Sequence, residues 1–418
     1  YGSQLQERRR AVHAALARVL EEGRDAPALL AHHWDEAGEI EPAVHWHREA
    51  ALDAGMNDAA SAVRHWERVC QLLGQLPETR ERLSLAAAAR AQVLWIEARR
   101  GAEPEHAWTL YEQARDFAER AGDLSSLART RFAYATCLFY AGEPGGPDMA
   151  RQALAEAERS GDLEVQIAAH WACAVFGNFA EDWAVAARHG AAALALCGDD
   201  LEIGAPVLGY SPWLIIRGLC GGALVMSGRL AEGAAMIAQS LGERGRRHRL
   251  TQAVCGSFTV FESRVRGEYR EALGIVQRSF ETLEELGATA GVRALLLLFL
   301  GQSLALNREW EGARDALERS LRLTTEYTTF RNLVTDIHTW LAHVALAVGD
   351  VERARRELDV GFAHARRQQL AVPLVDAHVV RARLLRVEGA GAEDVLRELA
   401  AAGQFADKVS AAGLVPEI

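Results

Sequence analysis

Pairs of small residues spaced seven positions apart recur along the chain, and they constrain its fold more than any other feature. Where two helices cross closely, the crossing needs a small side chain, and a residue seven positions later lies two turns along the same helical face. The pairs are Ala43 with Ala50, Ala107 with Ala114, Ala150 with Ala157, Ala186 with Ala193, Gly233 with Ser240, Ala272 with Ser279, Ala313 with Ser320, and Ala354 with Gly361. Such a series indicates helix pairs added along one axis rather than a single compact core.

The turns and the spacing between these pairs also indicate a repeat. Glycines five residues before a pair, which are expected to end the first helix of a unit, are Gly38, Gly228, Gly267 and Gly349. Further small residues, twelve positions before a pair, are Ala174, Gly221, Gly301 and Ala342. In the second half the pairs begin at 233, 272, 313 and 354, which gives spacings of 39, 41 and 41 residues. We therefore predict an all-α fold, an α-solenoid of tetratricopeptide-like helix pairs with a period of about 40 residues.

Interruptions of the pattern divide the chain into four parts. In order, we predict linking helices over residues 1–36, a first subsolenoid over 37–200, a loop insertion over 201–213, and a second subsolenoid over 214–418. The insertion contains Pro206, Gly209 and Pro212, which favour a loop, and we expect it to act as a hinge. The last pair, Val395 with Ala402, is degenerate, as is typical of a capping repeat.

Composition and charge narrow the classes of function. The formal net charge of -11 argues against a nucleic-acid partner, because phosphate binding needs a basic surface. The longest apolar run, Ala294 to Leu300, is far shorter than the roughly 20 residues that span a bilayer, so we expect no membrane anchor. The six cysteines form no CxxC pair, which is typical of reduced residues in a cytoplasmic protein.

One segment near the N-terminus resembles a known junction. Residues 30–55, LAHHWDEAGEIEPAVHWHREAALDAG, and residues 57–73, NDAASAVRHWERVCQLL, resemble the point where a STAND-type ATPase module meets its tetratricopeptide array. This junction occurs in large bacterial regulators, namely class III adenylate or guanylate cyclases with an attached ATPase and large ATP-binding LuxR-type transcription regulators. Residues 1–22 resemble the helix at the end of the ATPase region in those families.

The resemblance implies an upstream ATPase module in cis and a solenoid that senses an inducer or a partner. The parent protein would then be a nucleotide cyclase or another ATPase-controlled regulator. The final residues 403–418 are too short for a LuxR-type helix-turn-helix, which favours the cyclase-linked class, although a shortened chain would look the same.

The sequence offers no catalytic, cofactor or metal site. A phosphate-binding P-loop needs its lysine, and the single lysine, Lys408, lacks the glycines of that motif. Metal-binding histidines on a helix recur at i and i+3 or i+4, whereas His32 and His33 are adjacent and His45 and His47 are two apart. We therefore predict a non-catalytic chain without a cofactor or a metal, and structural or surface roles for the histidines.

A binding surface, if the chain has one, is expected on the concave side formed by the first helix of each pair. Counted from Ala174, Gly301 and Ala342, the candidate contacts are Trp171, Asn178, Gln302, Asp336, Thr339 and His343. The expected partner in this groove is a protein, a peptide or a small-molecule inducer. The alternative is that these side chains line a groove filled with water.

Three functions remain open at this point. The first is a sensor that regulates a STAND-type ATPase with cyclase or transcriptional output. The second is a free-standing tetratricopeptide adaptor that docks a protein or peptide, which any array of this kind could be. The third, an enzyme that uses the groove as its active site, is the weakest because no nucleophile, base or metal set converges.

Overall fold

The computed structural model describes residues 2–23, 26–101 and 103–413, and the regular elements in these ranges are all helical. The first four helices are α1 (Gly2–Gly23), α2 (Pro27–Ala37), α3 (Ile40–Ala54) and α4 (Ala59–Leu73). The helix pairs that follow are α5 (Arg80–Arg100) with α6 (Pro104–Ala121), α7 (Leu124–Ala141) with α8 (Gly146–Ser160), α9 (Leu163–Phe176) with α10 (Trp183–Cys197), α12 (Pro212–Met226) with α13 (Leu230–Ser240), α14 (Arg249–Gly256) and α15 (Thr259–Arg266) with α16 (Tyr269–Glu285), α17 (Ala290–Leu306) with α18 (Trp310–Glu326), α19 (Val334–Ala347) with α20 (Val351–Gln368), and α21 (Leu374–Val387) with α22 (Ala392–Lys408). Short elements between them are the π-helical turn η1 (Gly177–Glu181), α11 (Ala205–Leu208), and the 3-10 turns η2 (Glu243–Gly245) and η3 (Arg331–Leu333). The predicted solenoid of helix pairs is thereby confirmed.

Small residues allow the two helices of a unit to pack closely. All eight of the predicted pairs lie on the second helix of a unit, and all of these residues are buried. At the crossing of α12 with α13, a Cβ atom on Gly233 would lie 2.4 Å from the carbonyl oxygen of Gly221. A Cβ atom on Gly221 would lie 2.7 Å from the carbonyl oxygen of Gly233. The two backbones are therefore in direct contact, which explains why this spacing of small residues identifies the fold.

The predicted turn glycines end the first helices. Gly38 and Gly267 follow α2 and α15 in the left-handed conformation, with φ of 77° and 76°. Gly228 and Gly349 follow the last residues of α12 and α19 with φ of 84° and 83°. A side chain in this region costs roughly 1–2 kcal/mol, so glycine at these positions fixes where each first helix stops.

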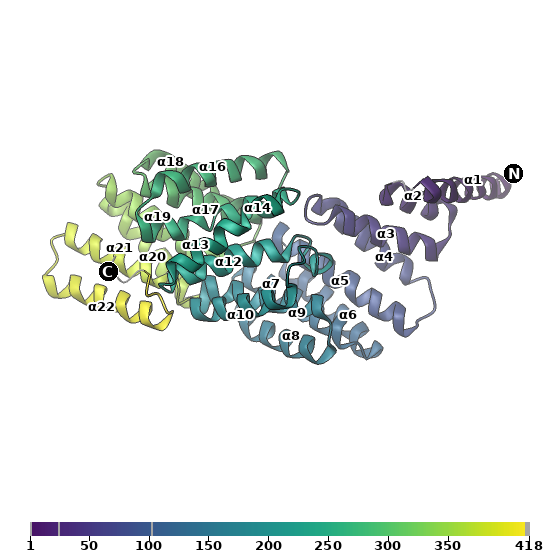
Figure 1. Cartoon of the computed structure of the whole chain (residues 1–418), viewed down its shortest axis with the longest axis horizontal. Helices are drawn as coiled ribbons and strands as arrows, with labels where there is room; N and C mark the ends of the chain where they lie inside the picture. Colours follow the sequence, from purple (N-terminus) through teal and green to yellow (C-terminus); the bar gives the residue numbers. More distant parts are fainter. Residues whose placement is uncertain (1, 24–25, 102, 414–418) are drawn as a thin grey trace.

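The superhelix closes on itself, which converts the concave surface into an interior. Helix α5 packs against α17, although the two belong to units far apart in the sequence. The hydroxyl of Thr329 donates to the carbonyl oxygen of Ala98 at 2.7 Å. Phe330 stacks on Tyr140 with ring centroids 3.9 Å apart. Figure 1 shows the resulting body as a thick bundle of antiparallel helices with α21 and α22 at one end.

Helices α1 to α4 form an arm, here termed the N-terminal arm, that projects from the opposite end of the body (purple, at the right of Figure 1). Within the arm, the guanidinium of Arg68 on α4 donates two hydrogen bonds of 2.7 Å to the carboxylate of Asp35 on α2. Helix α4 also packs against α5 of the body. The arm is thus internally braced and joined to the body through α4.

The predicted insertion, residues 201–213, lies against the body rather than extending into solvent. Its short helix α11 accepts hydrogen bonds from side chains of α5. The side-chain amide of Gln92 donates to the carbonyl oxygen of Pro206 at 2.6 Å, and the indole nitrogen of Trp95 donates to the carbonyl oxygen of Leu208 at 3.1 Å. The division into two subsolenoids and the hinge at this segment stay predictions.

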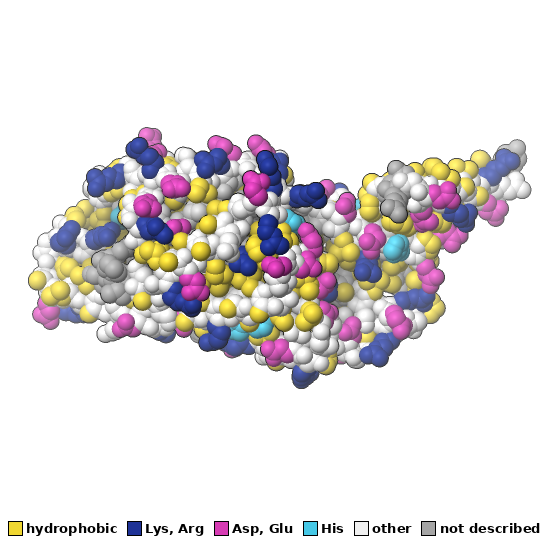
Figure 2. Space-filling model, in the orientation of Figure 1, with side chains coloured by type: hydrophobic (Ala, Val, Ile, Leu, Met, Phe, Trp, Pro, Cys, Tyr) yellow, Lys and Arg dark blue, Asp and Glu magenta, His cyan; other side chains and the backbone are white. Residues whose placement is uncertain are grey.

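Charged side chains of both signs are interspersed over the face shown in Figure 2. Ion pairs along and between helices are common in the structure, as in the pairing of Arg355 with Glu352 and Glu388. Among the described helices, none combines the length and the apolar character needed to cross a lipid bilayer.

Candidate functional site

Two adjoining chambers lie inside the closed superhelix. The first, termed the aromatic chamber, is lined by Arg99, Tyr140, Trp171, Tyr210, Phe330 and Asn332, together with apolar side chains from α12, α14 and α17. The centre of a water molecule can move through about 70 Å³ of this chamber, which is several times the roughly 10–15 Å³ that one water needs. The aromatic chamber is therefore large enough for a small organic molecule.

Arg99, in the last turn of α5, brings a positive charge into the aromatic chamber. Its side chain is only 2% exposed, and its guanidinium carbon lies 3.4 Å from the ring centroid of Trp95. The rings of Tyr140, Trp171 and Tyr210 are 5.3, 5.6 and 5.8 Å away. Aromatic faces attract a desolvated cation by about 2 kcal/mol or more, so this cage of rings stabilises the buried charge.

No carboxylate among the described residues neutralises Arg99. Its hydrogen bonds go to the carbonyl oxygen of Trp95 at 3.1 Å and to the hydroxyl of Tyr210 at 3.3 Å. Buried charges in proteins are usually paired or bound to a ligand. The aromatic chamber thus contains a cation whose compensation comes from rings and neutral oxygens.

Two residues that line the aromatic chamber carry a buried polar atom without a partner among the described residues. The indole nitrogen of Trp171 and the side-chain oxygen of Asn332 are buried, and neither has a hydrogen-bond partner among the described residues. Burial raises the pKa of the Tyr140 and Tyr210 hydroxyls, so both stay neutral near pH 7. Buried polar atoms in proteins are generally hydrogen-bonded. The indole nitrogen of Trp171 and the side-chain oxygen of Asn332 are therefore suited to form hydrogen bonds with a bound molecule.

The second chamber, termed the polar chamber, lies beside the first. Its polar lining residues are Asn178 of η1, Arg264 of α15, Gln302 of α17, Asp336 of α19 and Asp376 of α21. It is smaller, with about 30 Å³ open to the centre of a water molecule. Phe179 lines both chambers, so one ring forms part of the wall between them.

The charges of the polar chamber are paired within it. The guanidinium of Arg264 donates to the two carboxylate oxygens of Asp376 at 2.9 and 2.8 Å. Burial, followed by the negative charge of Asp376, raises the pKa of Asp336 to about 8, against the opposing effect of Arg264. Asp336 is therefore largely protonated at pH 7 and can donate a hydrogen bond.

The structure brings three of the six predicted contact residues together. Asn178, Gln302 and Asp336 all line the polar chamber, although they come from three helical elements that are distant in sequence. Both amide atoms of Asn178 are buried without a partner among the described residues. Trp171 lines the neighbouring aromatic chamber. Their role as ligand contacts stays a prediction.

The other two predicted contacts lie outside both chambers. The hydroxyl of Thr339 donates to the carbonyl oxygen of Thr335, one turn earlier on α19, at 2.8 Å. His343 packs edge-on against Trp310 and Trp340, and burial lowers its pKa to about 4. Both side chains are therefore engaged by their own surroundings.

An outer cleft adjoins the aromatic chamber. The two share Tyr210, Leu250 and Thr251, and the cleft is bordered by the α3–α4 connection, the insertion and the start of α14. Met56 of the α3–α4 connection also lines the aromatic chamber. A Cβ atom on Gly209 would lie 2.7 Å from Cγ of Met56, so Met56 is tightly seated. The N-terminal arm thus contributes one side chain to the chamber wall.

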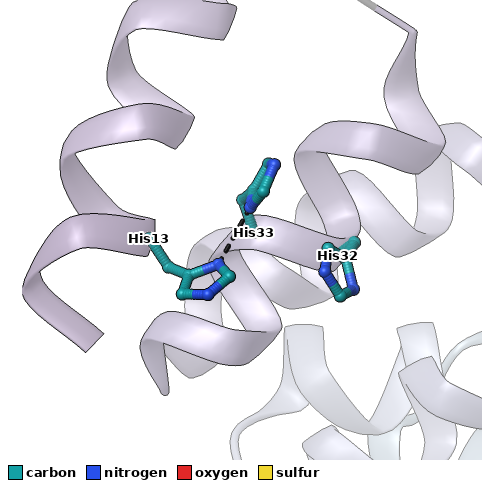
Figure 3. Close-up of side chains that lie close together, drawn as sticks. All are labelled: His13, His32 and His33. Atoms are coloured by element: carbon teal, nitrogen blue, oxygen red, sulfur yellow. Dashed lines mark hydrogen bonds between the residues drawn. The ribbon is translucent and has the colours of Figure 1, made fainter. Parts of the chain in front are cut away.

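A group of three histidines lies in the N-terminal arm. His13 of α1 and His33 of α2 are joined through their Nδ1 atoms at 2.9 Å, with His32 beside them (Figure 3). The three offer ligand nitrogens within 4.8 Å of one another. This set would have to contract around a zinc ion, whose bonds to nitrogen are about 2.0–2.1 Å long. The prediction of no bound metal remains untested.

The same kind of contact recurs elsewhere between consecutive helices. His47 approaches His65 at 2.8 Å, and His170 approaches His189 at 3.0 Å. Burial, and then the proximity of His170, lowers the pKa of His189 to about 4. A search for histidines spaced along one helix misses these pairs, because each pair joins two helices through residues 18 to 20 positions apart.

Sequence reasoning also missed the charged centre of the aromatic chamber. Arg99 and Arg100 are adjacent in the sequence, yet Arg99 is buried whereas Arg100 pairs with Glu97 at 2.6 Å near the surface. The available signal is the number of large aromatic residues at helical spacing, a pattern that is equally typical of an ordinary core. Only the closure of the superhelix shows that several of them surround one guanidinium.

Comparisons by sequence give no match. No protein-family model matches the chain, and no curated protein is detectably similar to it.

Solved structures are similar in fold. A Rap protein complexed with Competence and Sporulation Factor has a TM-score of 0.59 at 14% identity, covering 87% of this chain and 99% of that chain. The apo form of RapI has a TM-score of 0.51 at 10% identity, covering 87% and 98%. A human IFIT1 dimer with m7Gppp-AAAA has a TM-score of 0.51 at 14% identity, covering 87% and 77%. At such identities the similarity shows the fold alone, and that fold is an all-α solenoid of tetratricopeptide-like helix pairs.

Proposed function

We propose that the chain is a non-catalytic sensor solenoid that binds a ligand inside its closed superhelix and regulates a STAND-type ATPase in the same protein. The output of that parent protein would be nucleotide cyclisation or transcription. The N-terminal arm would transmit the state of the interior to the ATPase module. The observation that carries the proposal is the pair of interior chambers, each lined by some buried polar atoms without a partner among the described residues.

Buried polar groups without a hydrogen-bond partner reduce the stability of a protein. Each costs roughly 1–3 kcal/mol when its hydrogen bond is missing. The indole nitrogen of Trp171, both amide atoms of Asn178 and the side-chain oxygen of Asn332 are all of this kind among the described residues. All three residues line one of the two adjoining chambers, while other buried atoms without a partner among the described residues lie elsewhere. A ligand that supplies their missing partners would recover part of this cost, which supports a binding role for the interior.

The N-terminal arm provides a route from the interior to an upstream module. Residues 30–73, which resemble the STAND junction, include α3, α4 and their connection. Met56 in that connection is part of the aromatic chamber wall. A ligand in the chamber would therefore contact the arm directly.

The corresponding mechanism is a shift between two positions of the N-terminal arm. A ligand that binds one position more tightly favours it by the difference in binding free energy. Couplings of this kind are typically about 1–3 kcal/mol, equivalent to roughly 5- to 150-fold in an equilibrium constant. Changes in the seating of Met56 are expected to alter ATP turnover within this range.

Proteins of similar fold accommodate ligands of different kinds. The Rap protein was solved with Competence and Sporulation Factor, and human IFIT1 was solved with m7Gppp-AAAA. The fold alone therefore does not decide between a protein, a peptide or a small-molecule inducer for this chain. Our expectation that nucleic acid is not a partner rests on the acidic net charge and stays a prediction.

A free-standing adaptor is the second candidate. Its supporting observation is the match over 99% of the length of the Rap protein complexed with its factor. In this case the same interior would hold a peptide or protein segment, and no ATPase would be regulated in cis.

The decisive experiment begins with the gene. The open reading frame upstream of the Tyr1 codon is read to its start, and a P-loop followed by a winged-helix region is expected. A start codon within a few residues of Tyr1 would contradict the sensor proposal and favour the adaptor.

A second step tests the proposed coupling in the parent protein. Met56→Ala is expected to change basal ATP turnover severalfold, measured by phosphate release. The matched control is Met149→Ala on α8, a half-buried methionine outside both chambers. Equal turnover in the wild type and both variants would show that the chamber wall is not coupled to the ATPase.

A further inference from the structure

We propose that the aromatic chamber binds a small organic monocarboxylate, with its carboxylate on Arg99 and its apolar body against the surrounding rings. This inference rests on the proposed function, because it names the chemical class of the ligand that the interior senses. Three features of the chamber carry it: its charge, its hydrogen-bond donors and its apolar walls.

The single positive charge in the aromatic chamber favours a ligand with a single negative charge. Arg99 is the one charged side chain among the described residues that line it, and no described carboxylate pairs with it. A monoanion would neutralise this cation. A phosphate group carries about -1.5 to -2 charges at pH 7, so it would leave excess negative charge buried without a second cation. The balance therefore favours a carboxylate.

The donors match the geometry of a carboxylate. A guanidinium has five N–H donors arranged as a planar fork that can hold both oxygens of a carboxylate. In the described structure two hydrogen bonds of Arg99 go to Trp95 and Tyr210, which leaves donors for a ligand. The indole N–H of Trp171, buried and unpartnered among the described residues, adds one more donor in the same chamber.

The walls of the aromatic chamber select an apolar body. Away from Arg99 the lining is formed mainly by hydrophobic side chains, including Phe179, Phe258 and Leu295. Burying the body of a ligand against them removes apolar surface from water, which favours binding. The limited space of about 70 Å³ that is open to the centre of a water molecule favours a body of one ring or a short branched chain over a peptide segment.

The position of Met56 connects such a ligand to the proposed sensing. Met56 lines the chamber and belongs to the α3–α4 connection of the N-terminal arm. Methionine is flexible and adapts readily to the shape of a ligand. The apolar body of a carboxylate ligand on Arg99 would contact Met56. Binding in the chamber would therefore change the packing of the N-terminal arm.

The test compares acids with their neutral amides on the full chain at pH 7. The probes are phenylacetate, indole-3-acetate and isovalerate, each paired with its own amide and titrated by calorimetry up to about 10 mM. At least one acid is expected to bind about tenfold or more tightly than its amide, because hydrogen bonds to a charged group are worth more than neutral ones. If every acid binds no better than its amide, or none binds, the inference is wrong.

Two arginine variants locate the site. Arg99→Met keeps most of the side-chain volume and removes the charge, so it is expected to abolish the preference for the acid. Arg217→Met is the matched control, since Arg217 also stacks on a tryptophan, 4.0 Å from the ring centroid of Trp213, but lies outside the aromatic chamber. An equal loss in both variants, or an undiminished preference in Arg99→Met, would overturn the assignment to Arg99.

A more conservative variant covers the case in which Arg99→Met does not fold. Arg99→Lys keeps the positive charge but loses the planar fork, so it is expected to weaken acid binding while retaining some preference over the amide. Unchanged acid binding in Arg99→Lys would contradict a carboxylate held by the guanidinium. Circular dichroism confirms that each variant is folded.

The acid-binding test and the test of the proposed function can fail independently of each other. Failure of all acids with an ATPase encoded upstream would overturn the carboxylate inference alone. Acid binding at Arg99 without an upstream ATPase would instead support the chamber and contradict the regulatory role in cis.

Discussion

The two interior chambers place the same residue type in opposite electrostatic settings. In the polar chamber, Arg264 lies 5.6 Å from the ring centroid of Trp340 and donates two hydrogen bonds to Asp376. In the aromatic chamber, Arg99 lies 3.4 Å from the ring centroid of Trp95, and no described carboxylate pairs with it. Both arginines are buried against tryptophan, but only Arg264 has a counterion among the residues that the structure describes.

The presence or absence of a counterion distinguishes an internal ion pair from a candidate ligand site. Removing one member of a buried pair leaves an uncompensated charge, which is strongly destabilising. Removing a buried cation that has no ionic partner leaves no such charge behind. The stability of matched variants therefore reports which of the two arginines is part of the internal structure of the protein.

The largest effect is expected from Arg264→Met. This change leaves Asp376 without its partner in a chamber where the aspartate side chain is only 20% exposed, so the free energy of unfolding should fall by about 3–5 kcal/mol. Urea denaturation measures the loss. The control is Arg229→Met, because Arg229 and Glu232 are 60% and 54% exposed and such pairs contribute less than about 1 kcal/mol. Similar losses in both variants would remove the distinction drawn for the polar chamber.

The second effect is a pH dependence from Asp336. Its pKa is about 8 in the folded protein, against an ordinary pKa of 3.8 for an aspartate side chain. Between these values the folded state holds a proton that the unfolded chain has lost, so stability falls as pH rises through this window.

Asp336→Asn should remove that pH dependence. The stability of Asp336→Asn relative to the wild type should increase by about 3 kcal/mol from roughly pH 5 to 7.5, since each pH unit contributes about 1.4 kcal/mol. Urea denaturation at both pH values measures this difference, in which the contributions of the histidines cancel. A difference that does not change with pH would show that Asp336 is ionised in the folded state.

The smallest effect is expected from Arg99→Met. Methionine fills much of the same space and strands no carboxylate among the described residues, so the free energy of unfolding should change by less than about 1 kcal/mol. The measurement is the same urea denaturation as for Arg264→Met. A loss as large as that of Arg264→Met would show that Arg99 is essential to the fold, and the comparison of the two chambers would then fail.

The repeat was predictable because it depends on contacts between helices that are adjacent in the sequence. Gly221 and Gly233 are small since their helices touch, and that requirement is visible in the spacing of residues. Closure was not predictable, because the contact of Thr329 with Ala98 joins units that share no local pattern. A superhelix without the contact between α5 and α17 would have an open concave groove in place of the two chambers.

The interior residues were predictable only in part for the same reason. Register placed Asn178, Gln302 and Asp336 on first helices or their extensions, and the structure brings them to one chamber. Thr339 follows the same register but uses its hydroxyl within α19. Arg99 was missed because nothing in its local sequence distinguishes it from the surface residue Arg100.

Closure of the superhelix also bears on how such a chain can evolve. Open arrays gain or lose whole units with little penalty, because each unit meets only its immediate neighbours. Here the contact between Thr329 and Ala98 fixes how many units separate α5 from α17. Duplication or deletion of one unit between them would pull the two ends out of register and open both chambers. The structure therefore constrains the number of units within this segment.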